Sequence, residues 1–139
     1  MKAFERVTKN NEVIALIIRH SFSSKEGVEF FTPDEYSQQL AYMNRPKGHI
    51  IRSHFHNQVT REVKYTQEVL YIRSGKMKVN LFDSNLAFVT SKILQDGDVI
   101  LLASGGHGFE MLEKTEFIEI KQGPYAGDSD KEAFDSKME

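Results

Sequence analysis

Cysteine is absent from the 139 residues of this chain, and its absence excludes several kinds of chemistry at once. The chain can form no disulfide bond, offers no thiolate nucleophile and cannot hold zinc through sulfur. Any metal ion must therefore be held by imidazole and carboxylate groups.

Basic clusters and long apolar runs are also missing. The 18 basic side chains are balanced by 20 acidic ones, and no block of lysine and arginine could neutralise a row of phosphates. The apolar run at residues 13–18 is far shorter than the roughly 18 to 20 residues of a membrane-spanning helix, and the charged start lacks the features of a signal peptide. We therefore expect a cytoplasmic protein that binds neither nucleic acid nor membrane and takes a small molecule as its ligand.

Most segments are short, rich in valine, isoleucine, phenylalanine and tyrosine, and separated by turn residues. This pattern predicts an all-β sandwich or barrel. We expect strands at residues 12–22, 27–31, 49–56, 67–74, 76–82, 88–94, 98–103, 108–112 and 115–121. The length suits one domain, so we expect residues 1–139 to form a single domain with a barrel core at about 12–122 and a loosely packed tail at 123–139.

One segment, TPDEYSQQLAYMN from Thr32, carries helix signals instead. Thr32 suits an N-cap, Pro33 suits the first helical position, and Glu35 follows the cap by three residues. The sequence therefore predicts one short helix near residues 33–43.

The histidines of GHIIRSHFHN, residues 48–57, provide the first chemical signal. On a strand, residues two apart point to the same side, so His54 and His56 would present both imidazoles to one face, shared with Arg52. An H-x-H pair alone is a weak signal, because a strand can carry histidines for packing. Further along, Glu68 precedes Gly75 with six residues between them, and GDVILLASGGHG brings His107 after a glycine corner.

Together these motifs resemble the cupin superfamily, whose first motif reads G-x5-H-x-H, then E-x6-G, and whose second reads G-x5-P-x-G-x2-H. The resemblance covers about residues 48–112. It implies a cupin-type double-stranded β-helix, the jelly-roll barrel of small single-domain bacterial cupins, and a homodimer. It also implies one divalent transition metal (Fe, Mn, Ni, Co or Zn) held by His54, His56, Glu68 and His107, with Glu68 also acting in catalysis.

Two departures from the cupin pattern affect this interpretation. Eleven residues separate His56 from Glu68, where the family has three or four. In the second motif Ala103 replaces the usual proline, and one residue fewer separates Gly105 from His107. The glycine pair could let the backbone bring His107 to the same point by an unusual corner.

Other roles remain open for the same side chains. The two histidines could line a pocket, Glu68 could pair with Arg52 or Arg61, and His107 could cap a turn. Strand alternation places Arg52, Thr66, Phe109 and Met111 as further candidates around a ligand, and Tyr65 of the long loop could meet a ligand at the mouth of the pocket.

Two functional hypotheses follow, with a third less supported. The first is a metal-dependent enzyme that acts on a small polar substrate through isomerase, epimerase or dioxygenase chemistry, with analogy within the cupins pointing to a carbohydrate. The second is a non-catalytic module that binds a small ligand or a metal in its barrel. The third is a structural dimer partner with a vestigial site, which the shortened second motif supports weakly.

Overall fold

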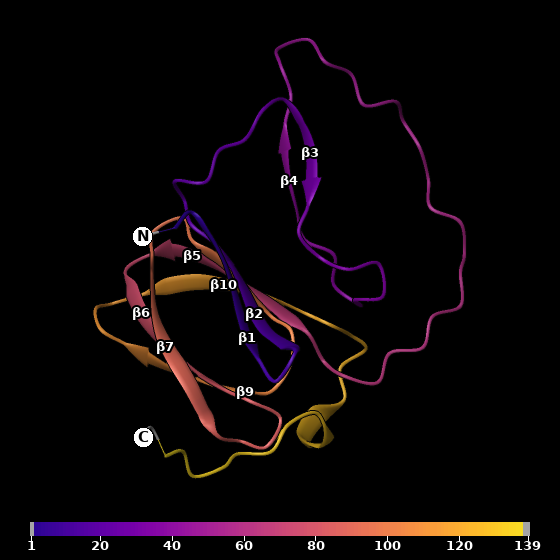
Figure 1. The fold of residues 1–139 in the computed structure, drawn as a ribbon. Coiled ribbons are helices and arrows are strands. Elements are labelled where there is room, and N and C mark those ends of the chain that lie inside the picture. The colour runs from indigo at the N-terminus through magenta and orange to yellow at the C-terminus, as the bar shows by residue number, and fades with distance from the viewer. Residues whose placement is uncertain (1, 138–139) are drawn as a thin grey trace.

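Ten strands and one turn of 3-10 helix are formed by residues 2–137, the part of the chain that the computed structural model describes (Figure 1). The strands are β1 (Phe4–Lys9), β2 (Glu12–Ile18), β3 (Gly27–Phe30), β4 (Ala41–Asn44), β5 (Glu68–Ser74), β6 (Lys76–Phe82), β7 (Phe88–Gln95), β8 (Val99–Leu102), β9 (Gly106–Met111) and β10 (Glu116–Lys121), and the helix is η1 (Gly127–Ser129). The predicted all-β fold is confirmed. Met1 and residues 138–139, the end of the predicted tail, lie outside the described residues.

Three antiparallel sheets organise these strands. The largest has the order β1-β2-β8-β5-β10, a second has the order β7-β6-β9, and β3 pairs with β4 alone. Leu70 and Ile72 of β5 share one buried core with Val79 and Leu81 of β6, so the two larger sheets pack face to face. Among the described residues the sheets do not close into a barrel, because β9 pairs only with β6 and β10 only with β5.

The outer face of the five-stranded sheet is covered by the chain between β2 and the end of β4. Leu16, Val69 and Leu101 alternate with the inner core residues and form a second buried cluster with Phe31. The half-buried side chains that pack against this cluster include Phe22, Tyr36, Leu40 and Tyr42. The segment that connects β2 to β4 therefore acts as a third layer.

The predicted helix near residues 33–43 is wrong. Residues 33–40 form turns, and β4 takes up Ala41–Asn44. The Thr32 hydroxyl, expected as an N-cap, instead donates to the Gln39 side-chain oxygen at 2.7 Å and accepts from the Leu40 backbone N–H at 3.1 Å. Pairing of β4 with β3 and burial of apolar side chains on the sheet outweigh the local capping signals, which are worth about 1 kcal/mol.

The predicted strand at residues 49–56 is not formed either. Residues 45–66 contain neither helix nor strand, and every one of them is exposed. In Figure 1 this segment swings round the outside of the molecule between β4 and β5. We call residues 45–66 the arm. A β pattern makes a strand only when a partner strand satisfies its backbone groups, and the described part of the chain supplies no such partner here.

The chain after β10 returns to the body. The ring of Phe134 packs edge-on against Phe82 at 5.1 Å between centroids, which fixes an otherwise mostly exposed tail. Within residues 2–137, no helix has the length and apolar character needed to cross a membrane.

Candidate functional site

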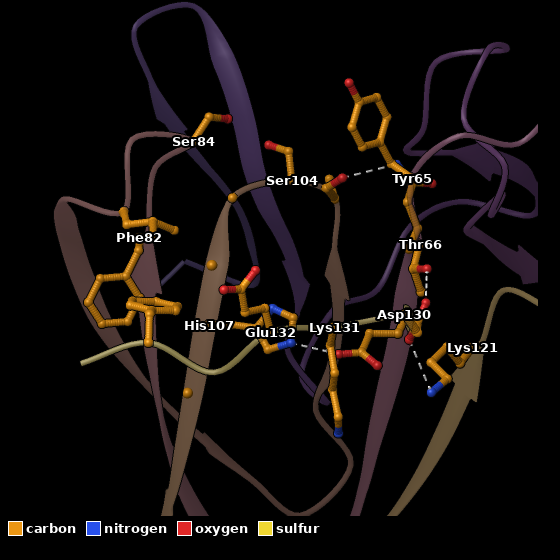
Figure 2. Close-up of a pocket in the computed structure, with 18 of the residues that line it drawn as sticks. Tyr65, Thr66, Phe82, Ser84, Ser104, His107, Lys121, Asp130, Lys131 and Glu132 are labelled. Carbon is orange, nitrogen blue, oxygen red and sulfur yellow. Dashed lines mark hydrogen bonds and ion pairs between the residues drawn. The ribbon is translucent and has the colours of Figure 1, made fainter. Parts of the chain in front are cut away.

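A wide hollow opens between the two larger sheets. Strands β5, β6, β9 and β10 line it, together with the end of the arm and the tail, and its volume is about 1580 Å³ (Figure 2). Its walls combine backbone glycines, aromatic rings and several charged side chains. This composition suits a small polar ligand.

Glu68 reaches this hollow because it begins β5. Leu70 and Ile72 point into the core, and on a strand Glu68 shares their side, just beyond the apolar part. His107 reaches it from β9, where it pairs with Leu81 of β6. The sequence alternation of both strands therefore brings an acid and an imidazole to one place.

The two side chains contact each other across the sheets. Nε2 of His107 lies 2.7 Å from Oε1 of Glu68, and the side chains are 31% and 12% exposed. Their contact joins the five-stranded sheet to the three-stranded one, while solvent still reaches both groups. A ligand in the hollow would meet them directly.

The glycine corner explains how His107 reaches Glu68 although the corner is one residue short. Gly105 has φ of +72°, and a Cβ there would lie 2.1 Å from the Phe82 carbonyl oxygen. A Cβ on Gly106 would lie 2.8 Å from the Phe134 ring. Only glycine fits at Gly105, where the clash is with backbone, whereas a side chain at Gly106 would have to displace the Phe134 ring.

A second carboxyl group stands beside the pair. Glu119 of β10 pairs with Leu70 and Lys121 pairs with Glu68 in the strand register, so both charged residues share the inner side of the sheet. Lys121 lies 3.5 Å from Asp130 of the tail. Figure 2 shows His107, Lys121 and Asp130 grouped around the same space.

These neighbours shift the pKa values of the two glutamates in opposite directions. The hydrogen bond from His107 is the main cause that lowers the pKa of Glu68 from 4.5 to about 2, helped by Glu119 and Lys121 and opposed by burial. The hydrogen bond with Glu68 is the main cause that raises the pKa of Glu119, and burial acts in the same direction. One carboxyl stays ionised while its neighbour more readily keeps a proton, an arrangement suited to acid–base chemistry.

The other expected site residues divide between the hollow and the arm. Tyr65 and Thr66 line the hollow, and the Thr66 hydroxyl donates to Asp130. Phe109 also lines it, with its ring centroid 5.3 Å from that of His107. Met111 is exposed further along β9, and Arg52 is exposed on the arm.

His54 and His56 remain a pair, but on the exposed arm. Their ring centroids lie 5.4 Å apart, and Nδ1 of His54 lies 2.9 Å from the Arg52 carbonyl oxygen. Within the described chain, no group of three or more histidine, aspartate or glutamate side chains is placed to hold a metal ion. Two of the four expected ligands meet in the hollow and the other two meet on the arm, so one copy as folded here does not fit a four-ligand metal centre.

The sequence interpretation missed Glu119, Lys121 and Asp130. A signal for two of them was present in TEFIEIKQ, where Phe117, Glu119 and Lys121 alternate on one side of the predicted strand. Charged residues at inward positions mark a polar site. The position of Asp130 depends on how the tail folds back, which no local pattern indicates.

Comparison of the chain with known protein families, with curated proteins and with solved structures found no match.

Proposed function

We propose that the protein is an enzyme that binds a small polar molecule in the hollow and moves protons on it, in the manner of an isomerase or epimerase. The observation that carries this proposal is the contact of Glu68 with His107, beside a second carboxyl whose pKa is displaced in the opposite direction. Pairs of titratable groups held at different pKa values are a common basis for acid and base roles.

Each group has a distinct role in this proposal. Glu68 accepts the Nε2 proton of His107, which leaves Nδ1 of the imidazole free to take a proton from the substrate. Glu68 stabilises the imidazolium that results, and Glu119 supplies a proton on the other side of the reaction. A positioned acid or base of this kind contributes about 10²- to 10⁴-fold in rate.

Solvent-exchange NMR tests the proposal without knowledge of the product. The protein is incubated in D₂O with a panel of aldoses, ketoses and their phosphates, and loss of the carbon-bound proton next to the carbonyl is followed. We expect exchange for at least one compound, and a rate lower by about 10²- to 10⁴-fold in Glu68→Gln. Binding of a panel member without any exchange would instead favour the non-catalytic binding module.

The cupin-type fold and its metal make up a separate, metal-dependent form of this proposal, because an ion bound by Glu68 and His107 would take the place of the hydrogen bond between them. The N3O set His54, His56, Glu68 and His107 suits Fe, Mn, Ni, Co or Zn, and a bound ion would polarise a substrate oxygen. Support comes from the spacing of the motifs and from the contact of Glu68 with His107, half of that set. With iron, dioxygenase chemistry becomes the alternative to isomerisation, and oxygen consumption separates them.

Elemental analysis tests the metal part. Untagged protein from metal-replete medium is compared with Glu68→Ala and His54→Ala, and we expect stoichiometric metal that both substitutions remove. Wild-type protein without bound metal would overturn the metal-dependent form of the proposal. Proton transfer by Glu68, His107 and Glu119 would still be tested by the exchange assay. Homodimer formation and a cytoplasmic location remain predictions.

A further inference from the structure

Two free sheet edges border the hollow. β9 and β10 each have one unpaired side within the described residues, so their backbone N–H and C=O groups face outward. Several large apolar side chains on these two strands are exposed: Phe109, Met111, Phe117, Ile118 and Ile120. The hollow of about 1580 Å³ exceeds the roughly 300–1,000 Å³ of small-ligand sites, as expected where one wall is missing.

The arm has the complementary properties. Ile50 and Phe55 are 83% and 85% exposed, and Ile51 and Val59 are exposed as well. Residues 49–56 have strand-like composition but no partner strand among the described residues. Such a segment can form a strand once it pairs with the free edge of a sheet.

Charge also matches the two surfaces. The arm carries five basic residues and one acidic residue, whereas residues 106–121, which contain β9 and β10, carry four glutamates and two lysines. Unlike charges on the two segments would favour their approach and oppose contact between two arms.

We propose that the arm of one copy of this chain docks as an added strand along β9 of a second copy, whose arm docks in return on the first. The exchange is reciprocal, so it closes as a symmetric pair. It covers exposed apolar side chains of the arm and of β9 in both partners and supplies the missing wall of each hollow.

The arm does not pack on its own body, and the connection after the histidines is long enough for it to reach a second copy. The eleven residues present here can span about 36 Å when extended, and every arm residue is exposed in its own copy.

The exchange would also complete the site, and this part rests on the proposed function. His54 and His56 lie two residues apart, so on an added strand beside β9 both imidazoles share one face with Arg52. With that face toward the hollow, they join Glu68 and His107 of the other copy. Each site is then built from both chains.

Cross-linking tests the exchange directly, because the chain has no cysteine of its own. The double variant Ser53→Cys/Glu110→Cys places one thiol on the arm and one on the outward face of β9, and a short bismaleimide links thiols on neighbouring strands. The matched control is Ser53→Cys/Ser91→Cys, with the second thiol on β7 at the opposite edge of the same sheet. Each single-cysteine variant controls for random collisions.

We expect a covalent dimer from the double variant and from a mixture of the Ser53→Cys and Glu110→Cys chains, with at least tenfold less from the controls. A cross-linked monomer would overturn the exchange, because the arm would then lie on its own β9. Chains that form no cross-link in any variant would overturn docking of the arm altogether. None of these results depends on metal or substrate, so the proposed function can fail alone.

A mixing experiment then tests the shared site. Chains with His54→Ala/His56→Ala are mixed, after unfolding and refolding together, with chains carrying His107→Ala. If the exchange occurs and the ligands are as proposed, metal binding reappears at about one quarter of the wild-type level, since half of the pairs are mixed and each has one intact site. Metal binding by neither variant nor mixture, alongside a covalent dimer in the cross-linking experiment, would leave the exchange standing and reject the metal site.

Discussion

Glu68 is the residue on which the proposed chemistry depends, and its environment is specific. It faces an imidazole at 2.7 Å and a second carboxyl, with Lys121 close by. A carboxylate surrounded in this way is held ionised far into the acidic range. The same contacts that suit it to orient His107 also link it to the stability of the fold.

Replacement of Glu68 by Gln tests this environment through the pH dependence of stability. The pKa of Glu68 is lowered from 4.5 to about 2, so its stabilising contribution is complete above pH 4.5 and is lost as the pH falls to about 2. We expect the difference in unfolding free energy between wild type and Glu68→Gln to shrink over that window, measured by urea unfolding at pH 6 to 2.

Glu119→Gln is the matched control, for which the expected pH dependence of stability has the opposite sign. The pKa of Glu119 is raised, so its contribution is present below pH 4.5 and is lost as the pH rises through its folded-state pKa. The variant should therefore gain stability relative to wild type as the pH rises. If the difference in unfolding free energy between wild type and Glu68→Gln stayed constant with pH, the account of both carboxyls would be contradicted.

Replacement of Gly105 tests the corner that brings His107 to Glu68. An alanine there would combine a φ of +72° with a Cβ 2.1 Å from a backbone oxygen. We expect Gly105→Ala to cost at least about 1–3 kcal/mol, measured by urea unfolding, and to shift the imidazole signals of His107. Gly108→Ala is the control, because its Cβ would meet nothing within 4 Å, and it should change stability by less than about 0.5 kcal/mol.

At the scale of elements, a buried ion pair ties the end of β2 to the turn before β8. Arg19 and Asp98 are both buried and lie 3.1 Å apart, and Arg19 also pairs with Glu5 of β1 at 2.8 Å. The other Asp98 oxygen accepts the backbone N–H of His20 at 2.9 Å. This network holds three parts of the five-stranded sheet together.

Removal of one partner from this network should be costly. Asp98→Ala removes one of the two carboxylates that pair with the buried Arg19 and leaves the backbone N–H groups of His20 and Gln95 without their acceptor, and we expect a loss of about 3–5 kcal/mol by urea unfolding. The surface pair between Lys78 and Glu110, 3.0 Å apart, provides the comparison. Glu110→Ala should cost less than about 1 kcal/mol, and equal losses from the two variants would contradict the role given to burial.

The sequence predicts elements best where alternation and turn chemistry agree. In β5 and β6 the apolar alternation, with Gly75 between them, locates both strands to within one residue. The signals of residues 33–43 fail because they are local, whereas the outcome depends on pairing with β3 and on packing against the outer sheet face. For the site, the spacing of Glu68 and His107 is informative, but the contribution of Glu119 depends on the register of β10.

The arm marks the limit of such prediction. GHIIRSHFHN carries a strand pattern, yet residues 45–66 form no strand in one copy. Sequence alternation indicates that a segment can form a strand, whereas the strand with which it pairs depends on the whole assembly.

At the scale of the whole molecule, a single copy has an exposed apolar arm, two free edges beside its hollow and a hollow without one wall. One exchange between two copies would cover the arm, pair the β9 edge and supply the missing wall. On this account Ile50, 83% exposed on the arm and on the same face as His54 and His56, becomes an interface residue, whereas the equally prominent Tyr125, 84% exposed on the tail, does not.

Native mass spectrometry of the untagged protein at micromolar concentration tests this central claim most directly. Wild type and Tyr125→Asp should appear at twice the chain mass of 16.0 kDa, and Ile50→Asp should shift toward the single chain because a buried, unpaired charge disfavours docking of the arm. A wild-type protein that appears only as a single chain would contradict the account.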